Sequence, residues 1–145
     1  GLGEGAVAMA GLAAFLGHLW PVFFRFEGGK GVATALGVLV GISPWLGLFT
    51  ALTWLVVALV SRYSSLASLS SAVLAPLVYV LAGGMLWSTD RATVVAIMAM
   101  SALLAWRHQE NISRLVQGKE SRLGKSKDAA AAVPVAANRK HRKRH

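Results

Sequence analysis

The residues best suited to chemistry in this sequence begin with a glycine-rich stretch, Gly28-Gly29-Lys30-Gly31, which lies directly before a helix-compatible run. Glycines allow backbone N–H groups to turn toward an anion, a following helix N-terminus adds positive potential, and the lysine adds a full charge. The stretch is not a Walker A loop, because that motif needs Gly where Phe24 stands and Ser or Thr in place of Gly31. It predicts a phosphate-binding loop, although a simple turn with its lysine extended toward water would explain the same residues.

Two further polar stretches each follow an apolar segment. Ser61-Arg62-Tyr63 offers a hydroxyl and a forked guanidinium that suit a phosphate oxyanion. The alternative is a topological anchor at the arginine and an interfacial aromatic at the tyrosine. The third stretch runs from Arg107 to Glu120. If it is helical, His108 and Asn111 lie on the same face of that helix. A solvated juxtamembrane helix is the competing interpretation of that stretch.

The composition indicates a membrane protein. Apolar residues make up 55% of the 145 positions, charged residues only 14%, and the mean hydropathy is +0.56. The absence of cysteine excludes disulfide scaffolds, cysteine–zinc sites and thiol nucleophiles. No group of His, Asp or Glu has the spacing of metal ligands, so we expect neither a metal site nor a cofactor.

Five apolar segments predict an all-α, polytopic transmembrane fold with about five membrane helices. A straight membrane span needs about 17 to 25 residues. The second apolar segment, Gly31–Ile42, is shorter than this, so it is a candidate for a short, re-entrant helix. Proline disfavours helix at the residue before it, so Ser43-Pro44 favours a break over one long helix from 31 to 60. The five segments are Gly5–Leu19, Gly31–Ile42, Pro44–Val60, Leu66–Ala82 and Ala92–Trp106.

The basic residues predict the orientation. With five crossings, 14 of the 15 Lys and Arg residues lie on the cytoplasmic side, and only Arg91 lies outside. We therefore divide the chain into a transmembrane region, 1–127, and a disordered, basic C-terminal tail, 128–145. Attraction to anionic lipid headgroups is sufficient to explain that tail, and we expect no nucleic-acid partner.

The polar stretches resemble the motifs of a known family. GHLWPVFFRFEGGKGVAT, at 17–34, closely resembles the second signature motif of the bacterial acyl-phosphate:glycerol-3-phosphate acyltransferases, the PlsY family. SRYSSL and RHQENISRLVQGKE are similar to two further stretches of that family, in the same order. The family has another motif with Ser and Arg in its N-terminal third, which nothing here matches. We therefore expect a C-terminal portion of such an enzyme and do not expect catalysis from this chain alone.

The resemblance implies an inner-membrane enzyme of about seven helices whose active site faces the cytoplasm. It implies transfer of an acyl group from acyl phosphate to the 1-hydroxyl of glycerol 3-phosphate, which gives lysophosphatidic acid and phosphate in bacterial phospholipid synthesis. The expected partners are acyl phosphate, glycerol 3-phosphate and membrane lipid. We assign catalysis to Lys30, His108 and Asn111, with His108 or the substrate's own phosphate as the base. The expected phosphate ligands are Gly28, Gly29, Lys30, Gly31, Thr34, Ser61, Arg62, Arg107 and Glu120.

Two other classes of protein compete with the enzyme. Short helices interrupted by Gly or Pro also build the binding sites of transporters and channels for small anions. A membrane-anchored module that acts through its basic tail is the third class. A transporter does not explain why the polar stretches fall on the same side of the membrane, and the module leaves the glycine-rich stretch without a role.

Overall fold

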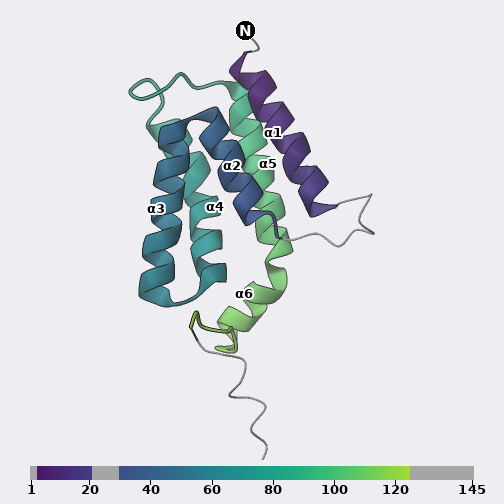
Figure 1. Ribbon diagram of the computed structural model, residues 1–145, viewed down its shortest axis with the longest axis vertical. Helices are drawn as coiled ribbons and strands as arrows, with labels where there is room; N and C mark the ends of the chain where they lie inside the picture. Colours follow the sequence, from purple (N-terminus) through teal and green to yellow (C-terminus); the bar gives the residue numbers. More distant parts are fainter. Residues whose placement is uncertain (1–2, 21–29, 125–145) are drawn as a thin grey trace, which may run out of the picture.

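The fold is a bundle of α-helices, shown in Figure 1 as a computed structural model in which residues 3–20 and 30–124 are described. No strand forms in those two ranges, so the all-α prediction is confirmed there. The elements in chain order are α1 (Glu4–Leu19), α2 (Val32–Ile42), α3 (Pro44–Ser61), α4 (Ser64–Leu81), α5 (Arg91–Arg107) and α6 (Gln109–Val116).

The first five helices begin and end within two residues of the predicted apolar segments. The predicted break between the second and third segments is also confirmed. Ser43 is extended, with φ −153° and ψ 123°, and Pro44 occupies the first turn of α3, where its missing N–H costs no helical hydrogen bond. The chain reverses at this point, so a single helix from 31 to 60 does not form.

Helices α3 and α4 are each 18 residues long and apolar enough to cross a membrane, with mean hydropathies of 1.8 and 1.7. The apolar helices α1 and α2 are shorter. The membrane character is thus supported, whereas the prediction of five spans is not confirmed. Large apolar side chains on the outer faces of α3 and α4 are exposed, among them Val60 at 81% and Val73 at 66%.

Helices α2 and α3 meet at one end of the bundle and diverge toward the other (Figure 1). Their close approach needs Gly47, because a Cβ there would stand 2.3 Å from the side chain of Val40. Helix α1 packs on α2 and α5, and α4 packs on α3 and α5. The buried core between them contains Phe15, Leu19, Leu39, Leu46, Ala72, Ala75, Tyr79, Ile97, Met100 and Leu104.

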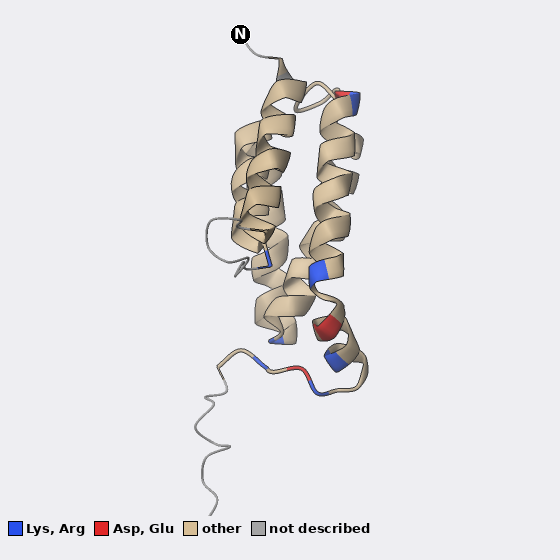
Figure 2. Ribbon diagram, turned by 90° about the vertical axis from the view of Figure 1, so that its right-hand side faces the viewer, with Lys and Arg blue, Asp and Glu red and all other residues tan. Residues whose placement is uncertain are grey.

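The charged residues coloured in Figure 2 lie mostly near the two ends of this bundle. At one end, Asp90 caps α5 by accepting a hydrogen bond from the Thr93 N–H at 3.0 Å. The other end carries α6 and most of the Lys and Arg residues that the structure describes. The described part of the chain therefore has one end where most of its basic residues lie, whereas the predicted orientation in the membrane stays a prediction.

Candidate functional site

A polar pocket lies at the basic end and brings together residues that are far apart in the sequence. Its volume is about 260 Å³. Lys30 comes from the segment before α2, His108 from the junction of α5 and α6, and Asn111 from α6. The pocket is lined by Lys30, Val32, Trp54, Ser64, Ser65, Ser68, His108 and Asn111. The three residues predicted to be catalytic thus share one pocket.

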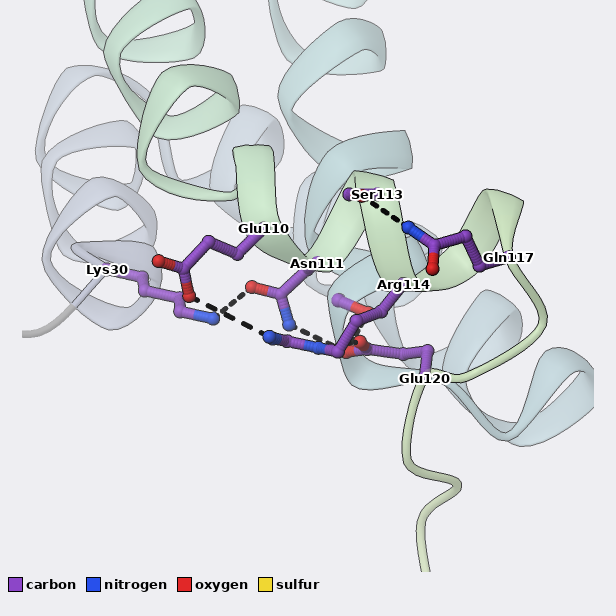
Figure 3. Close-up of polar contacts among 8 residues, drawn as sticks. Lys30, Glu110, Asn111, Ser113, Arg114, Gln117 and Glu120 are labelled. Carbon is purple, nitrogen blue, oxygen red and sulfur yellow. Dashed lines mark hydrogen bonds and ion pairs between the residues drawn. The ribbon is translucent and has the colours of Figure 1, made fainter.

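A chain of hydrogen bonds joins two residues of this pocket, Lys30 and Asn111, to Glu120 (Figure 3). The Lys30 ammonium donates to Oδ1 of Asn111. The Asn111 side-chain amide then donates to Oε1 of Glu120 at 2.6 Å. Because its two ends are engaged in this way, the buried Asn111 amide has one orientation and holds the lysine in place.

Glu120 is the acceptor for three donors, two from α6 and one from α4. Its Oε1 also accepts from the Ser65 hydroxyl at 2.8 Å, and its Oε2 accepts from Nε of Arg114 at 2.8 Å. Burial raises the pKa of this carboxyl, but the hydrogen bonds from Asn111, Arg114 and Ser65 outweigh burial and lower the pKa overall. Glu120 is therefore a carboxylate whose oxygens are occupied by protein donors.

His108 is buried, and its ring orientation is set by the backbone. Nδ1 lies 2.8 Å from the carbonyl oxygen of Leu104, which can only accept, so Nδ1 carries the proton. Burial lowers the pKa of His108 and the Lys30 charge lowers it further, against the opposing effects of the Leu104 carbonyl and Glu120. The neutral ring consequently keeps a lone pair at Nε2, which suits a general base.

Gly31 forms the N-cap of α2 in a conformation that few other residues adopt. Its φ is +78°, and a Cβ there would stand 2.5 Å from the ring of Phe15. The residue therefore allows α2 to begin directly beside Lys30. Thr34, one turn further along α2, is half-buried and does not line the polar pocket. Gly28 and Gly29 lie outside the described residues.

The remaining predicted phosphate ligands do not line the pocket. The Ser61 hydroxyl donates to the Val57 carbonyl at 2.6 Å within its own helix. The Arg62 guanidinium donates to the Leu123 carbonyl at 3.2 Å. Arg107 is half-buried in the last turn of α5, next to His108. Within this structure, Ser61 and Arg62 thus contact backbone carbonyls, outside the polar pocket.

Sequence reasoning overlooked the serines of α4. Ser65 and Ser68 line the pocket, and the Ser68 hydroxyl accepts a hydrogen bond from the indole of Trp54 at 3.0 Å. The detectable signal was the recurrence of serine at 64, 68 and 71, which places hydroxyls on one helical face of an otherwise apolar segment.

An apolar cavity of about 350 Å³ adjoins the polar pocket. The two share Val32, Trp54 and Ser68, so they meet at the level of the tryptophan. From there the cavity extends into the bundle, along α2, α4 and α5, as far as Leu39 and Ala75. The paired spaces suit an amphipathic ligand with a charged head and an apolar tail.

Comparison with known proteins adds independent findings. A family model described as glycerol-3-phosphate acyltransferase matches residues 2–118. A curated glycerol-3-phosphate acyltransferase from Albidiferax ferrireducens is 60% identical over 125 residues, which cover 86% of this chain and 56% of that protein. One from Burkholderia pseudomallei is 57% identical over 129 residues, covering 89% of this chain and 62% of the relative.

Two crystal structures of PlsY, described as an integral membrane glycerol 3-phosphate acyltransferase, are similar to this fold. One is a glycerol 3-phosphate form and the other a lysophosphatidic acid form. Each has a TM-score of 0.74 and 45% sequence identity, and each match covers 81% of this chain. The matches cover 56% and 57% of the PlsY chains. The chain thus spans little more than half the length of the proteins that it matches.

Proposed function

This chain belongs to the glycerol-3-phosphate acyltransferase family, of the PlsY type, and from that premise we propose its reaction. It transfers an acyl group from acyl phosphate to the 1-hydroxyl of glycerol 3-phosphate, which gives lysophosphatidic acid and phosphate. The reaction takes place at the cytoplasmic face of the bacterial inner membrane and supplies phospholipid synthesis.

The observation that carries this proposal is the junction of the two cavities. A cationic lysine, a neutral imidazole and a side-chain amide line the polar pocket, and a deep apolar space opens beside them. Both proposed substrates carry phosphate, and the donor also carries a long apolar chain. A polar pocket with a cationic lysine, joined to an apolar cavity, accommodates both parts of that donor.

The chemical step needs no covalent enzyme intermediate, because acyl phosphate is an activated anhydride. The glycerol hydroxyl oxygen attacks the acyl carbon, a new ester C–O bond forms, and the bond from that carbon to the phosphate oxygen breaks. The hydroxyl proton passes to Nε2 of His108 or to the departing phosphate. Lys30 neutralises charge on the phosphate. Asn111 positions the Lys30 ammonium for this role by accepting its hydrogen bond.

The base assignment predicts how activity depends on pH. Because the pKa of His108 is lowered, the imidazole is neutral at pH 7, and kcat/KM should rise with pH through an apparent pKa below about 6.5. Replacing His108 with Gln should lower kcat/KM about 100-fold and abolish this rising limb. The measurement is the pH–rate profile of the parent and of His108→Gln. If kcat/KM of the variant still rises with pH in the same range, the titrating group is the substrate's phosphate and not His108.

The apolar cavity predicts a separate effect on the acyl donor. Replacing Ala72, which lines the cavity, with Phe should fill part of it and lower kcat/KM for long-chain acyl phosphates about tenfold. Short-chain donors should be much less affected. The control is Val73→Phe, one position along α4 on its exposed face. Equal losses for long and short chains would contradict an acyl site in this cavity.

The proposed function is tested by reconstitution into lipid vesicles with acyl phosphate and glycerol 3-phosphate. Because the chain spans only part of its relatives, it is assayed alone and joined to the part of the A. ferrireducens relative that precedes the matched residues. We expect lysophosphatidic acid from the chimera, and its formation should persist after deletion of residues 129–145. Uptake of glycerol 3-phosphate into sealed vesicles without any product would support a transporter instead.

A further inference from the structure

The segment that follows α6 returns along the turn between α3 and α4. We call residues 117–124 the strap. It leaves α6 through Gly118, with φ +69°, and ends at Gly124, with φ +82°. Both left-handed conformations suit glycine, and the one at Gly118 turns the chain away from the direction of α6 two residues before Glu120. The strap thereby carries Glu120 back toward the polar pocket, where Glu120 holds Asn111 and Ser65.

Arg62 clamps the strap at its far end by two hydrogen bonds. The Arg62 carbonyl accepts from the Leu123 N–H at 2.7 Å, and the Arg62 guanidinium donates to the Leu123 carbonyl at 3.2 Å. Gly124 also belongs to this contact, since a Cβ there would stand 3.1 Å from the guanidinium. Arg62 and Leu123 are 61 positions apart, so the clamp joins the α3–α4 turn to the strap.

A second contact reinforces the clamp. Nε of Arg122 donates to the Tyr63 hydroxyl at 3.2 Å, and the Arg122 guanidinium lies 5.6 Å from the centre of the same ring. Tyr63 is the residue after Arg62, so neighbouring residues of the turn hold neighbouring residues of the strap. The strap is therefore fastened on one side of Glu120 by α6 and on the other by this turn.

The backbone conformation of Arg62 is unusual for a residue with a side chain, which supports a specific role for the arginine at this position. Arg62 has φ +64°, the only positive φ at a non-glycine position within residues 3–20 and 30–124. A side chain in this region costs about 1 to 2 kcal/mol, and glycine is the usual residue where a helix ends in this way. At this position the chain carries an arginine whose guanidinium reaches the strap.

We propose that Arg62 is a positioning residue for the acyl transfer, and that it acts through the strap rather than by binding phosphate. Its guanidinium holds Leu123, the strap holds Glu120, Glu120 orients Asn111, and Asn111 holds Lys30. This inference rests on the proposed function, because it assigns a role in that reaction. It also replaces the direct contact between Arg62 and phosphate that sequence analysis predicted.

The first test is Arg62→Gly, which removes the guanidinium and favours the same backbone conformation. We expect kcat/KM to fall about five- to tenfold, and amide hydrogen exchange in residues 119–124 to quicken at least tenfold. The control is Arg91→Gln at the opposite end of the bundle, which should alter neither quantity. If exchange in the strap stays slow while the rate falls, the proposal is overturned. Exchange is measured without substrate, so the expected faster exchange of the strap in Arg62→Gly can be tested even if the acyltransferase activity itself is absent.

The second test separates positioning from phosphate binding. This chain has no cysteine, so Arg62→Cys with Leu123→Cys introduces the only two thiols of its part of the chimera, and any cysteine in the added N-terminal part is replaced with serine. A short bis-maleimide then joins the strap to the turn without any guanidinium. We expect the uncross-linked double variant to be as slow as Arg62→Gly and the cross-linked form to return to within about twofold of the parent. A cross-linked form with a protected strap and an impaired rate would show that the guanidinium itself is required, which overturns the proposal.

Discussion

Replacing Lys30 with methionine should lower kcat/KM for glycerol 3-phosphate by about two to three orders of magnitude. The Lys30 ammonium lies in the polar pocket, bonded to Asn111, and it is the cation placed to stabilise charge on the phosphate. Methionine keeps the length of the side chain and removes the charge, so packing beside α2 should be little changed. The measurement is steady-state kinetics of the chimera in lipid vesicles.

The matched control for Lys30 is a cation elsewhere in the chain. Arg91 is exposed at the first position of α5, at the end opposite the pocket, so Arg91→Met should leave kcat/KM within about twofold. Lys30→Arg should retain part of the activity, because the charge remains while the donor geometry changes. If Lys30→Met has the same kcat/KM as the parent, Lys30 does not bind the phosphate of the substrate.

Replacing Glu120 with alanine should destabilise the protein by about 1 to 3 kcal/mol. Its side chain is 6% exposed and accepts from Asn111, Ser65 and Arg114, so its removal leaves these donors without their acceptor. The loss should be visible as a large fall in Tm during thermal unfolding in detergent. Activity should fall as well, because Asn111 loses the partner that orients it.

Glu110 provides the control for Glu120. It pairs with the same Arg114 at 3.7 Å, but its side chain is 83% exposed, so Glu110→Ala should cost less than about 0.5 kcal/mol. Comparable losses in both variants would contradict the central place given to Glu120.

Acid titration gives a second readout of Glu120. Its pKa is lowered in the folded protein, so its contribution to stability is complete above the unfolded pKa of about 4.3 and is lost as pH falls through the folded value. Glu120→Gln should remove this component of acid sensitivity. An unchanged acid transition in that variant would mean that other groups govern it.

The helices were predictable because apolar length and proline position decide them locally. The break at Ser43-Pro44 follows from the geometry of proline, and the structure has it at that position. The number of membrane crossings was less accessible, because α1, α2 and α5 are shorter than the two helices that are long enough to span a membrane. Length alone does not show whether a short apolar helix crosses the bilayer or lies partly buried in the protein.

The candidate site was predictable only in part. Residue type and boundary position were enough to select Lys30, His108 and Asn111, which the structure brings into one pocket. The contact of Arg62 with Leu123 was not accessible, since it depends on left-handed backbone at both Arg62 and Gly124. The roles of all these residues in catalysis stay predictions.

The most direct test of the account is a crystal structure of the chain, or of its chimera, with glycerol 3-phosphate bound. We predict that the phosphate lies within hydrogen-bond distance of the Lys30 ammonium and that the 1-hydroxyl approaches Nε2 of His108. Phosphate bound instead between Arg62 and Arg122, with the polar pocket holding only solvent, would contradict both the site and the role given to the strap.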